Sequence, residues 1–302
     1  MSQHWDEKNI PSQKDKVFLI TGANSGLGLE SAKALAWKGA HIVMAVRKNL
    51  KGQAALNGIK KENPTVSAEV MELDLADLDS VQHFTDQFKS RYQKLDVLIN
   101  NAGVMIPKHR GETAQGFELQ FGTNHLGHFA LTAQLLDTLM ATPQSRVVTL
   151  SSLVAKMKNA HIYWNDLQWT SYYDRSAAYA QSKLANQMFG VELQERLKKK
   201  KADTISVLAH PGYSSTNLQR HLGALGDVMN MIAAQSVKIG VLPQLRAATD
   251  PAVTGGEFYG PTKMNEYRGY PDKVSLAEAA TDAAARKRLW ELSEKLTDQK
   301  FL

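Results

Sequence analysis

The stretch KVFLITGANSGLGLESAKALAWKGAHIVMAV, residues 16–46, decides the fold of this chain. It opens with a short apolar run rich in branched and aromatic side chains, which is typical of a strand. Three glycines follow, and the next residues, about 27–37, have the apolar spacing of a helix that ends at Gly39. The run 41–46 is almost wholly apolar, as a strand buried on both faces requires. Strand, glycine loop, helix and strand form a βαβ unit.

The same alternation continues along the chain. Helical patterns occupy about 50–62, 77–92, 113–140 and 177–191, and strand-like apolar runs occupy 66–73, 95–100, 146–152 and 204–210. Strands separated by helices predict a parallel sheet with right-handed crossovers. We therefore expect an α/β fold: one doubly wound, Rossmann-type domain over residues 1–302, with a parallel seven-stranded sheet flanked by helices on both faces. Residues 1–14 form a polar lead, and residues 261–302 form a C-terminal extension with a charged helix.

Composition narrows the class of protein. The 302 residues carry 36 basic and 30 acidic side chains, a formal charge of +6, and the excess is spread along the chain. The sharpest basic run, 198–201, falls at a predicted helix end, where cations complement the helix dipole, so we expect no nucleic-acid partner. The absence of cysteine excludes disulfides, thiolate metal sites and a cysteine nucleophile. Without an apolar signal core or an apolar run near the ~18 residues of a membrane span, we expect a cytoplasmic protein with no transmembrane anchor.

The glycine loop predicts a dinucleotide site. In TGANSGLG, residues 21–28, the glycines permit positive φ and let backbone N–H groups approach a pyrophosphate, and the helix N-terminus adds its dipole. At the end of the second strand, where NAD sites usually carry an acid for the ribose hydroxyl, the chain has Arg47 and Lys48. A guanidinium can bind a 2′-phosphate through two hydrogen bonds, so NADP(H) is favoured over NAD(H). A bare strand-to-helix turn and a solvated basic pair are the alternatives.

A Tyr-x-x-x-Lys pair lies in the helix predicted over 177–191. Tyr179 and Lys183 are four residues apart and share a helix face, so the Lys183 cation is expected to lower the pKa of the Tyr179 phenol. A tyrosine with such a shift can transfer a proton near neutral pH. A second pair of the same spacing, Tyr259 and Lys263, encloses a Gly-Pro dipeptide that forbids a helix, so these two side chains should not share a face.

These motifs resemble those of the short-chain dehydrogenase/reductase family, over about residues 16–260. TGANSGLG resembles the cofactor loop of that family, NNAG at 100–103 resembles its motif after the fourth strand, and HPG at 210–212 its Pro-Gly after the sixth strand. RVVTLSS, the long interval between the candidate serine and tyrosine, and AAYAQSKLAN look most like the retinol dehydrogenase and protochlorophyllide reductase-like branch.

The resemblance also implies roles for single residues. Ser152, Tyr179 and Lys183 resemble the catalytic triad, with Tyr179 as general acid or base and Ser152, or alternatively Ser151, as its hydrogen-bonding partner. Lys183 would hold the nicotinamide ribose, and Asn124, in GTNHLGHF, would hold a water in a proton relay to Lys183. The predicted cofactor contacts are Gly22, Asn24, Ser25, Gly26, Leu27, Gly28, Arg47, Lys48, Asp74, Leu75, Asn101, Ala102, Gly103, Tyr179, Lys183, Pro211 and Gly212.

The function implied by the resemblance is that of an NADP(H)-dependent oxidoreductase (EC 1.1.1.-). It would transfer a hydride between nicotinamide and a carbonyl compound or alcohol, on a lipophilic or aromatic small molecule. The alternative is a non-catalytic NADP(H)-binding regulatory protein on the same fold, whereas a nucleotide-sugar epimerase would need a larger C-terminal domain. The family implies a homodimer or homotetramer formed through the long helices beside the fourth and fifth strands, unless the C-terminal extension blocks that face.

Three further features remain open at this level. His125 and His128 lie three residues apart on a predicted helix without a third ligand, so we expect packing or capping roles and no metal site. Residues 214–250 occupy the place of the family's substrate lid, although their apolar face could contact a partner subunit or a membrane surface. Aromatic side chains between 156 and 175 either wall a lipophilic pocket or pin a long loop. They are Tyr163, Trp164, Trp169, Tyr172 and Tyr173.

Overall fold

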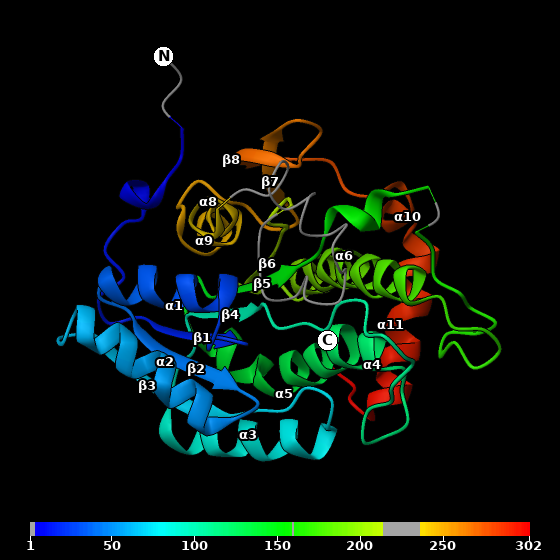
Figure 1. Ribbon diagram of the computed structural model, residues 1–302, viewed down its shortest axis with the longest axis horizontal. Coiled ribbons are helices and arrows are strands. Elements are labelled where there is room, and N and C mark those ends of the chain that lie inside the picture. The colour runs from blue at the N-terminus through cyan, green and yellow to red at the C-terminus, as the bar shows by residue number, and fades with distance from the viewer. Residues whose placement is uncertain (1–3, 159, 214–235) are drawn as a thin grey trace.

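The computed structural model describes residues 4–158, 160–213 and 236–302. Its centre is an eight-stranded sheet with the order β3-β2-β1-β4-β5-β6-β7-β8 (Figure 1), which confirms one doubly wound α/β domain. The strands are β1 (Val17–Thr21), β2 (His41–Val46), β3 (Ser67–Glu72), β4 (Val97–Asn100), β5 (Arg146–Leu150), β6 (Ile205–Ala209), β7 (Phe258–Lys263) and β8 (Arg268–Lys273). The helices are η1 (Glu7–Asn9), α1 (Gly26–Trp37), α2 (Asn49–Glu62), α3 (Leu78–Arg91), α4 (Leu119–Phe121), η2 (Gly122–Leu126), α5 (Gly127–Ala141), η3 (Leu153–Lys156), α6 (Arg175–Lys199), α8 (Val237–Gly240), α9 (Leu242–Thr249), α10 (Glu278–Thr281) and α11 (Ala283–Thr297).

Helices cover both faces of the sheet because successive strand residues point to opposite sides. Phe18 and Ile20 of β1 are fully buried on the side of α1, α2 and α9, whereas Leu19 is fully buried on the side of α3, α5 and α6. Figure 1 shows α8 and α9 beside α1, and α5 beside α3. The central strands therefore have apolar residues on both faces, which is why they appear in the sequence as continuous apolar runs.

The expected sheet of seven parallel strands is wrong at its C-terminal edge. β1 to β7 run parallel, but an eighth strand, β8, pairs antiparallel with β7. Its residues, RGYPDK, are mostly polar and only partly buried, as an edge strand permits, so no apolar run marks it in the sequence. The pair Tyr259 and Lys263 lies in β7, which confirms that it is not helical; Tyr259 is buried and Lys263 is exposed.

Two predicted helices have different limits in the structure. The stretch predicted over 113–140 begins with a turn, and helix starts only at α4, where the Glu118 carboxylate caps the first turn. The π-helical turn η2 then leads into α5. The helix predicted over 177–191 is longer: α6 begins after its N-cap Asp174 and ends in the basic run 198–201, as expected for cations at a helix C-terminus.

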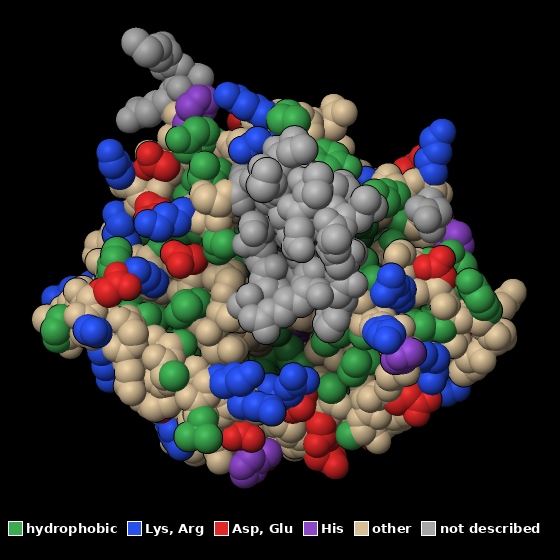
Figure 2. Space-filling model, viewed as in Figure 1, with side chains coloured by type: hydrophobic (Ala, Val, Ile, Leu, Met, Phe, Trp, Pro, Cys, Tyr) green, Lys and Arg blue, Asp and Glu red, His purple; other side chains and the backbone are tan. Residues whose placement is uncertain are grey.

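The C-terminal third of the chain adds to the core. Residues 236–250, the end of the predicted lid, form α8 and α9, whose apolar side chains pack beside α1; the rest of that lid, 214–235, lies outside the described residues. α11 packs against α5 and α6 (Figure 1). On the face drawn in Figure 2, basic and acidic side chains are interspersed over most of the surface. None of the helices in the described parts of the chain is both long and apolar enough to span a bilayer.

Candidate active site

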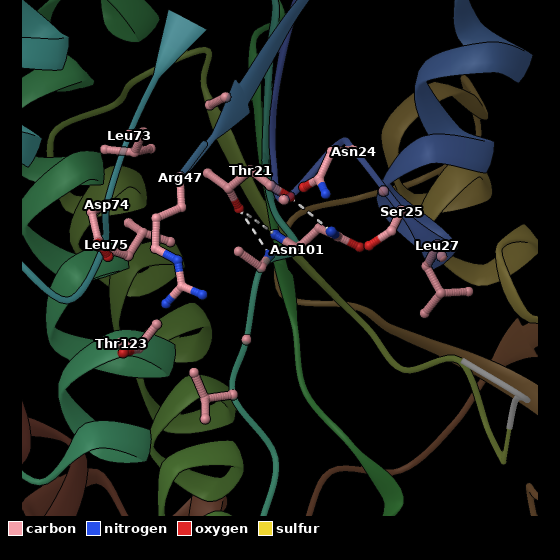
Figure 3. A pocket seen from close by; sticks show the side chains of 17 residues that line it. Thr21, Asn24, Ser25, Leu27, Arg47, Leu73, Asp74, Leu75, Asn101 and Thr123 are labelled. Carbon is pink, nitrogen blue, oxygen red and sulfur yellow. Dashed lines mark hydrogen bonds between the residues drawn. The ribbon is translucent and has the colours of Figure 1, made fainter. Parts of the chain in front are cut away.

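A cavity of about 300 Å³ lies at the carboxyl ends of the first strands of the sheet (Figure 3). Doubly wound sheets bind their ligands at this edge. Of the predicted cofactor contacts, the lining includes Gly22, Asn24, Ser25, Gly26, Leu27, Gly28, Arg47, Asp74, Leu75, Asn101, Ala102 and Gly103. Motifs that are far apart in the sequence therefore meet around one cavity.

The glycine loop has no space for side chains where its backbone approaches Asn101. A Cβ on Gly28 would lie 2.5 Å from the Gly22 carbonyl oxygen and 2.6 Å from Asn101 Nδ2, and Gly22 has a φ of +68°. Ser25 is the N-cap residue of α1, but its side chain makes no capping hydrogen bond. The first N–H groups of α1 therefore keep hydrogen-bonding capacity for a ligand, and the loop fits a pyrophosphate.

Arg47 extends its guanidinium into the cavity, on the side where Asp74 and Leu75 lie (Figure 3). The guanidinium makes no ion pair or hydrogen bond with the residues that the structure describes. Lys48 is placed differently, because it is the N-cap residue of α2 and does not line the cavity. Of the basic pair, Arg47 is therefore the one positioned to meet a ligand there.

Tyr179, Ser152 and Lys183 meet beside the carboxyl end of β5. Tyr179 and Lys183 project from one face of α6, with Lys183 Nζ 5.8 Å from the centre of the Tyr179 ring. Ser152, the N-cap residue of η3, lies close enough to the Tyr179 hydroxyl to lower the pKa of the phenol. Lys183 Nζ lies 3.4 Å from the Leu150 carbonyl oxygen at the end of β5. The fold thus brings a phenol, a hydroxyl and an amine into one buried cluster.

Burial controls the protonation of this cluster. It raises the pKa of Tyr179 to about 12, against the smaller opposing effect of the nearby Ser152 hydroxyl, and lowers the pKa of Lys183 to about 8. The expected lowering of the Tyr179 pKa is not met, because removal of the phenol from water is the largest effect on it and only Ser152 opposes that effect. Tyr179 is therefore protonated at neutral pH.

The neighbouring Ser151 has other partners. Its hydroxyl donates to the Lys183 main-chain carbonyl oxygen at 2.8 Å and accepts from Gln187 Nε2 at 3.2 Å. These bonds hold Ser151 against α6. Of the two serines, Ser152 is the one that the structure places at the phenol.

Asn124 lies in the π-helical turn η2, a kind of distortion often found at functional sites. Its Oδ1 accepts from the Val104 amide at 2.7 Å, and its Nδ2 donates to the Val104 carbonyl oxygen and to Ser182 Oγ, both at 2.9 Å. A Cβ on Gly103 would lie 3.1 Å from Asn124 Oδ1 and 3.6 Å from Lys183 Nζ. Because Gly103 lines the cavity, Asn124 and Lys183 stand at its edge.

His128 links this turn to the glycine loop. Its Nδ1 lies 3.0 Å from the Asn124 carbonyl oxygen, and its Nε2 lies 2.9 Å from Thr21 Oγ1. Burial lowers the pKa of His128 to about 4, so the ring is neutral. Since a carbonyl oxygen only accepts, Nδ1 carries the proton and the Thr21 hydroxyl donates to Nε2. Thr21 Oγ1 in turn accepts from the Asn101 and Ala102 amides, both at 2.9 Å.

Pro211 and Gly212 do not line this cavity. They follow β6, whose last residue, Ala209, accepts a hydrogen bond from the Ser151 amide at 2.9 Å. The Pro-Gly turn therefore adjoins the segment that carries Ser152, away from the glycine loop.

Several residues of the lining were not predicted from the sequence. Four of them, all except Ala45, directly adjoin a residue that was predicted, and two of these four, Thr21 and Leu73, lie at or directly after a strand end, which is the signal that could have found them. The unpredicted lining residues are Thr21, Ala45, Leu73, Val104 and Thr123.

The aromatic side chains between 156 and 175 do not line the cavity. Trp169 is buried, with its ring 4.3 Å from that of Tyr163, and Trp164 packs on a core cluster. The Tyr173 hydroxyl is hydrogen-bonded to the capping carboxylate of α4 at 3.1 Å, whereas Tyr172 is exposed. These contacts favour the interpretation that the aromatic residues pin the loop.

Comparison with known sequences places the chain in a family. The sequence model of the short chain dehydrogenase family matches residues 16–164. Retinol dehydrogenase 13 of Homo sapiens is 38% identical over 289 residues, which cover 93% of this chain and 84% of that protein. Retinol dehydrogenase 12 of Homo sapiens is 42% identical over 282 residues, which cover 92% and 85%.

Solved structures are similar along the whole chain or most of it. The crystal structure of an uncharacterized protein from Mycobacterium paratuberculosis has a TM-score of 0.84 and 40% identity, covering 99% of this chain and 100% of that one. A crystal structure from Beutenbergia cavernae, of an NAD(P)-dependent gluconate 5-dehydrogenase with bound NADP, has a TM-score of 0.66 and 23% identity, covering 82% and 95%, and shares the fold. From its sequence relatives and its fold, the chain belongs to the short-chain dehydrogenase/reductase family of oxidoreductases, in the branch of the retinol dehydrogenases.

Proposed function

We propose that this protein is an NADP(H)-dependent oxidoreductase (EC 1.1.1.-) that interconverts a lipophilic or aromatic carbonyl compound and its alcohol. The observation that carries the proposal is the buried Tyr179, beside Ser152 and Lys183, at the edge of a cavity with a glycine loop. A regulatory protein that only binds the cofactor would need the cavity but not the cluster of Tyr179 and Lys183. Burial of the Lys183 amine beside the phenol costs free energy, and cofactor binding alone does not explain that cost.

The chain's own residues account for the proton chemistry. Bound NADPH supplies the hydride for reduction. Tyr179, protonated at neutral pH, donates its proton to the carbonyl oxygen, and the nearby Ser152 hydroxyl orients the phenol. Lys183 stabilises the phenolate that forms, and Asn124 lies where a proton relay to Lys183 would begin. In alcohol oxidation these residues act in the opposite direction.

The residues in and beside the cavity would bind different parts of the cofactor. The loop 22–28 would hold the pyrophosphate, Asp74 and Leu75 the adenine, and Lys183 the nicotinamide ribose, with Pro211-Gly212 at the reacting end. Arg47 would bind the 2′-phosphate, and its guanidinium, without a partner among the described residues, supports NADPH over NADH.

The relatives support the substrate class. They are named retinol dehydrogenases, and retinol is a lipophilic alcohol whose oxidation gives an aldehyde. We therefore place the substrate among apolar alcohols, aldehydes and ketones.

The first test is titration with NADPH and NADH, followed by NADPH oxidation with a panel of aromatic and lipophilic aldehydes, ketones and quinones. Tyr179→Phe should bind NADPH like the wild type and lose carbonyl reduction, because the substitution removes only the proton donor. Tight NADPH binding by the wild type without turnover in either direction would instead indicate the regulatory protein.

A further inference from the structure

A second group of charged side chains, outside the catalytic cluster, joins three loops. Glu266, in the turn between β7 and β8, accepts hydrogen bonds from Lys156 Nζ at 2.8 Å and 2.6 Å, and lies 2.9 Å from His210 Nε2. Lys156 ends η3, whose N-cap is Ser152, and His210 directly follows β6. The side chains of Lys156, Glu266 and His210 are 15%, 22% and 0% exposed. Water therefore screens these contacts only weakly.

The hydrogen bonds of His210 determine where its proton lies. The Gly212 amide donates to Nδ1 at 3.2 Å, so Nδ1 is unprotonated and the Nε2–H donates to the Glu266 carboxylate. Burial lowers the pKa of His210, which keeps the ring neutral. The Gly212 amide thus donates to His210, and His210 donates to Glu266. The Lys156 ammonium neutralises the charge of the Glu266 carboxylate.

The backbone around this group fits it closely. A Cβ on Gly260 would overlap the His210 ring, and a Cβ on Gly212, which has a φ of +65°, would lie 2.6 Å from Pro261 Cγ. Residues 264–266 have φ values of 52°, 52° and 67°, in the left-handed region that side chains disfavour. Such a conformation persists where the surrounding contacts determine it. The hydrogen bonds of the Glu266 carboxylate with Lys156 and His210 are contacts of this kind.

We propose that Glu266, His210 and Lys156 are positioning residues for the nicotinamide end of the cofactor. They fix the Gly212 amide relative to the segment that begins at Ser152, and so join the β7–β8 hairpin to the reacting end of the site. The inference rests on the proposed function, in which the Pro-Gly turn contacts the cofactor. Since this turn lies away from the glycine loop, the network should leave the adenosine half unaffected.

The test compares two ligands that reach different parts of the site. NADPH spans the site, whereas 2′,5′-ADP lacks the nicotinamide half. In Glu266→Gln we expect about tenfold weaker binding of NADPH, measured by nicotinamide fluorescence, because a charge-assisted contact is lost at that end. Binding of 2′,5′-ADP, measured by calorimetry, should not change. His210→Leu removes both the donor for Glu266 and the acceptor for Gly212, and should have the same selective effect.

A second measurement needs no cofactor. Pro211-Gly212 is the only Pro-Gly pair in the sequence, so ¹³C-carbonyl proline combined with ¹⁵N-glycine labelling selects the Gly212 amide in an NMR spectrum. Its proton resonance should move upfield in both variants, because the hydrogen bond to His210 is weakened or lost. This measurement tests the network even where the fluorescence signal is small.

Glu69→Gln is the matched control. Glu69 also pairs with a cation, Arg91 at 3.0 Å, and with the Tyr92 hydroxyl, but it lies in β3, at the opposite edge of the sheet. This variant should leave the Gly212 resonance and both affinities unchanged. Equal weakening of NADPH and 2′,5′-ADP in Glu266→Gln, or an unmoved Gly212 resonance, would overturn the network. A selective loss in Glu266→Gln without any turnover by the wild type would overturn the reductase and support the network.

Discussion

Arg47 carries the proposed choice between NADPH and NADH, and this can be tested at a single side chain. Arg47→Ala should weaken NADPH binding by roughly tenfold to a hundredfold, because a hydrogen bond to a charged group contributes ~1.5–3 kcal/mol, and should leave NADH binding unchanged. Lys48→Ala is the control, since Lys48 carries the same charge and does not line the cavity. Similar losses for the two variants, or a loss of NADH binding in Arg47→Ala, would contradict the assignment.

Lys183 should set the pH dependence of reduction. Its pKa is lowered to about 8 by burial, so it is protonated below this pH and loses its charge above it, whereas Tyr179, with a pKa raised to about 12, keeps its proton throughout. kcat/KM for NADPH should therefore fall as the pH rises through about 8, with a slope approaching about one log unit per pH unit. Lys183→Arg keeps a cation at higher pH and should remove this fall, whatever its residual rate. A wild-type profile that stays flat to about pH 10 would show that the Lys183 charge is not required.

For single residues, the sequence predicts which side chains lie together but not how burial changes their pKa values. Tyr179, Lys183 and Ser152 could be brought together in prediction because a helix periodicity and the end of a buried strand suffice for it. The direction of the Tyr179 pKa could not be predicted, because it depends on water being excluded by segments distant in sequence. The hydrogen bond between His128 and Thr21 was not predicted either, because the two residues are 107 positions apart in the sequence.

The glycine loop can be tested as an element through its tightest position. Gly28→Ala would place a Cβ 2.5 Å from the Gly22 carbonyl oxygen, and such overpacking costs ~1–3 kcal/mol and should displace the loop. We expect lower stability to urea and loss of NADPH binding. Gly58→Ala, in α2, meets no atom within 4 Å and should instead stabilise the protein by ~0.5–1 kcal/mol through helix propensity. Equal stability changes in the two variants would show that the loop has space that the structure does not indicate.

The limits of a helix or strand could be predicted where its capping residues and its apolar spacing agree with the way it packs in the fold. α3 has Asp77 as its N-cap and an apolar stripe that ends in Phe88, so its limits follow from the sequence. β8 has neither an apolar run nor alternation, because it is the last strand of the sheet and its pairing is decided by β7. The turn before α4 was taken for helix because nothing local marks Glu118 as a cap until its carboxylate is seen on the amides of Gln120 and Phe121.

At the scale of the whole molecule, the C-terminal helix occupies the face through which the family resemblance implies pairing. α11 packs on α5 and α6, the helices beside the fourth and fifth strands. Trp290 is 2% exposed, with its ring centre 5.1 Å from that of Phe129 and 5.8 Å from that of Phe189, and the Arg196 guanidinium lies 4.3 Å from the ring. The chain thus covers with its own residues the aromatic side chains on the face where the family resemblance implies pairing.

Removal of this helix should therefore change the state of assembly. Deletion of residues 283–302 exposes Phe129 and Phe189 together, and the loss of the Trp290 contacts alone should cost at least about 3 kcal/mol of stability. Because an apolar patch of this kind favours association, we expect the shortened chain to self-associate with rising concentration, as measured by size-exclusion chromatography with light scattering. Lys287→Ala, on the exposed side of α11, should leave both mass and stability unchanged. A shortened chain with the mass and the urea midpoint of the intact protein would mean that α11 neither stabilises the fold nor blocks this face, and pairing through α5 and α6 would then be open to the intact protein as well.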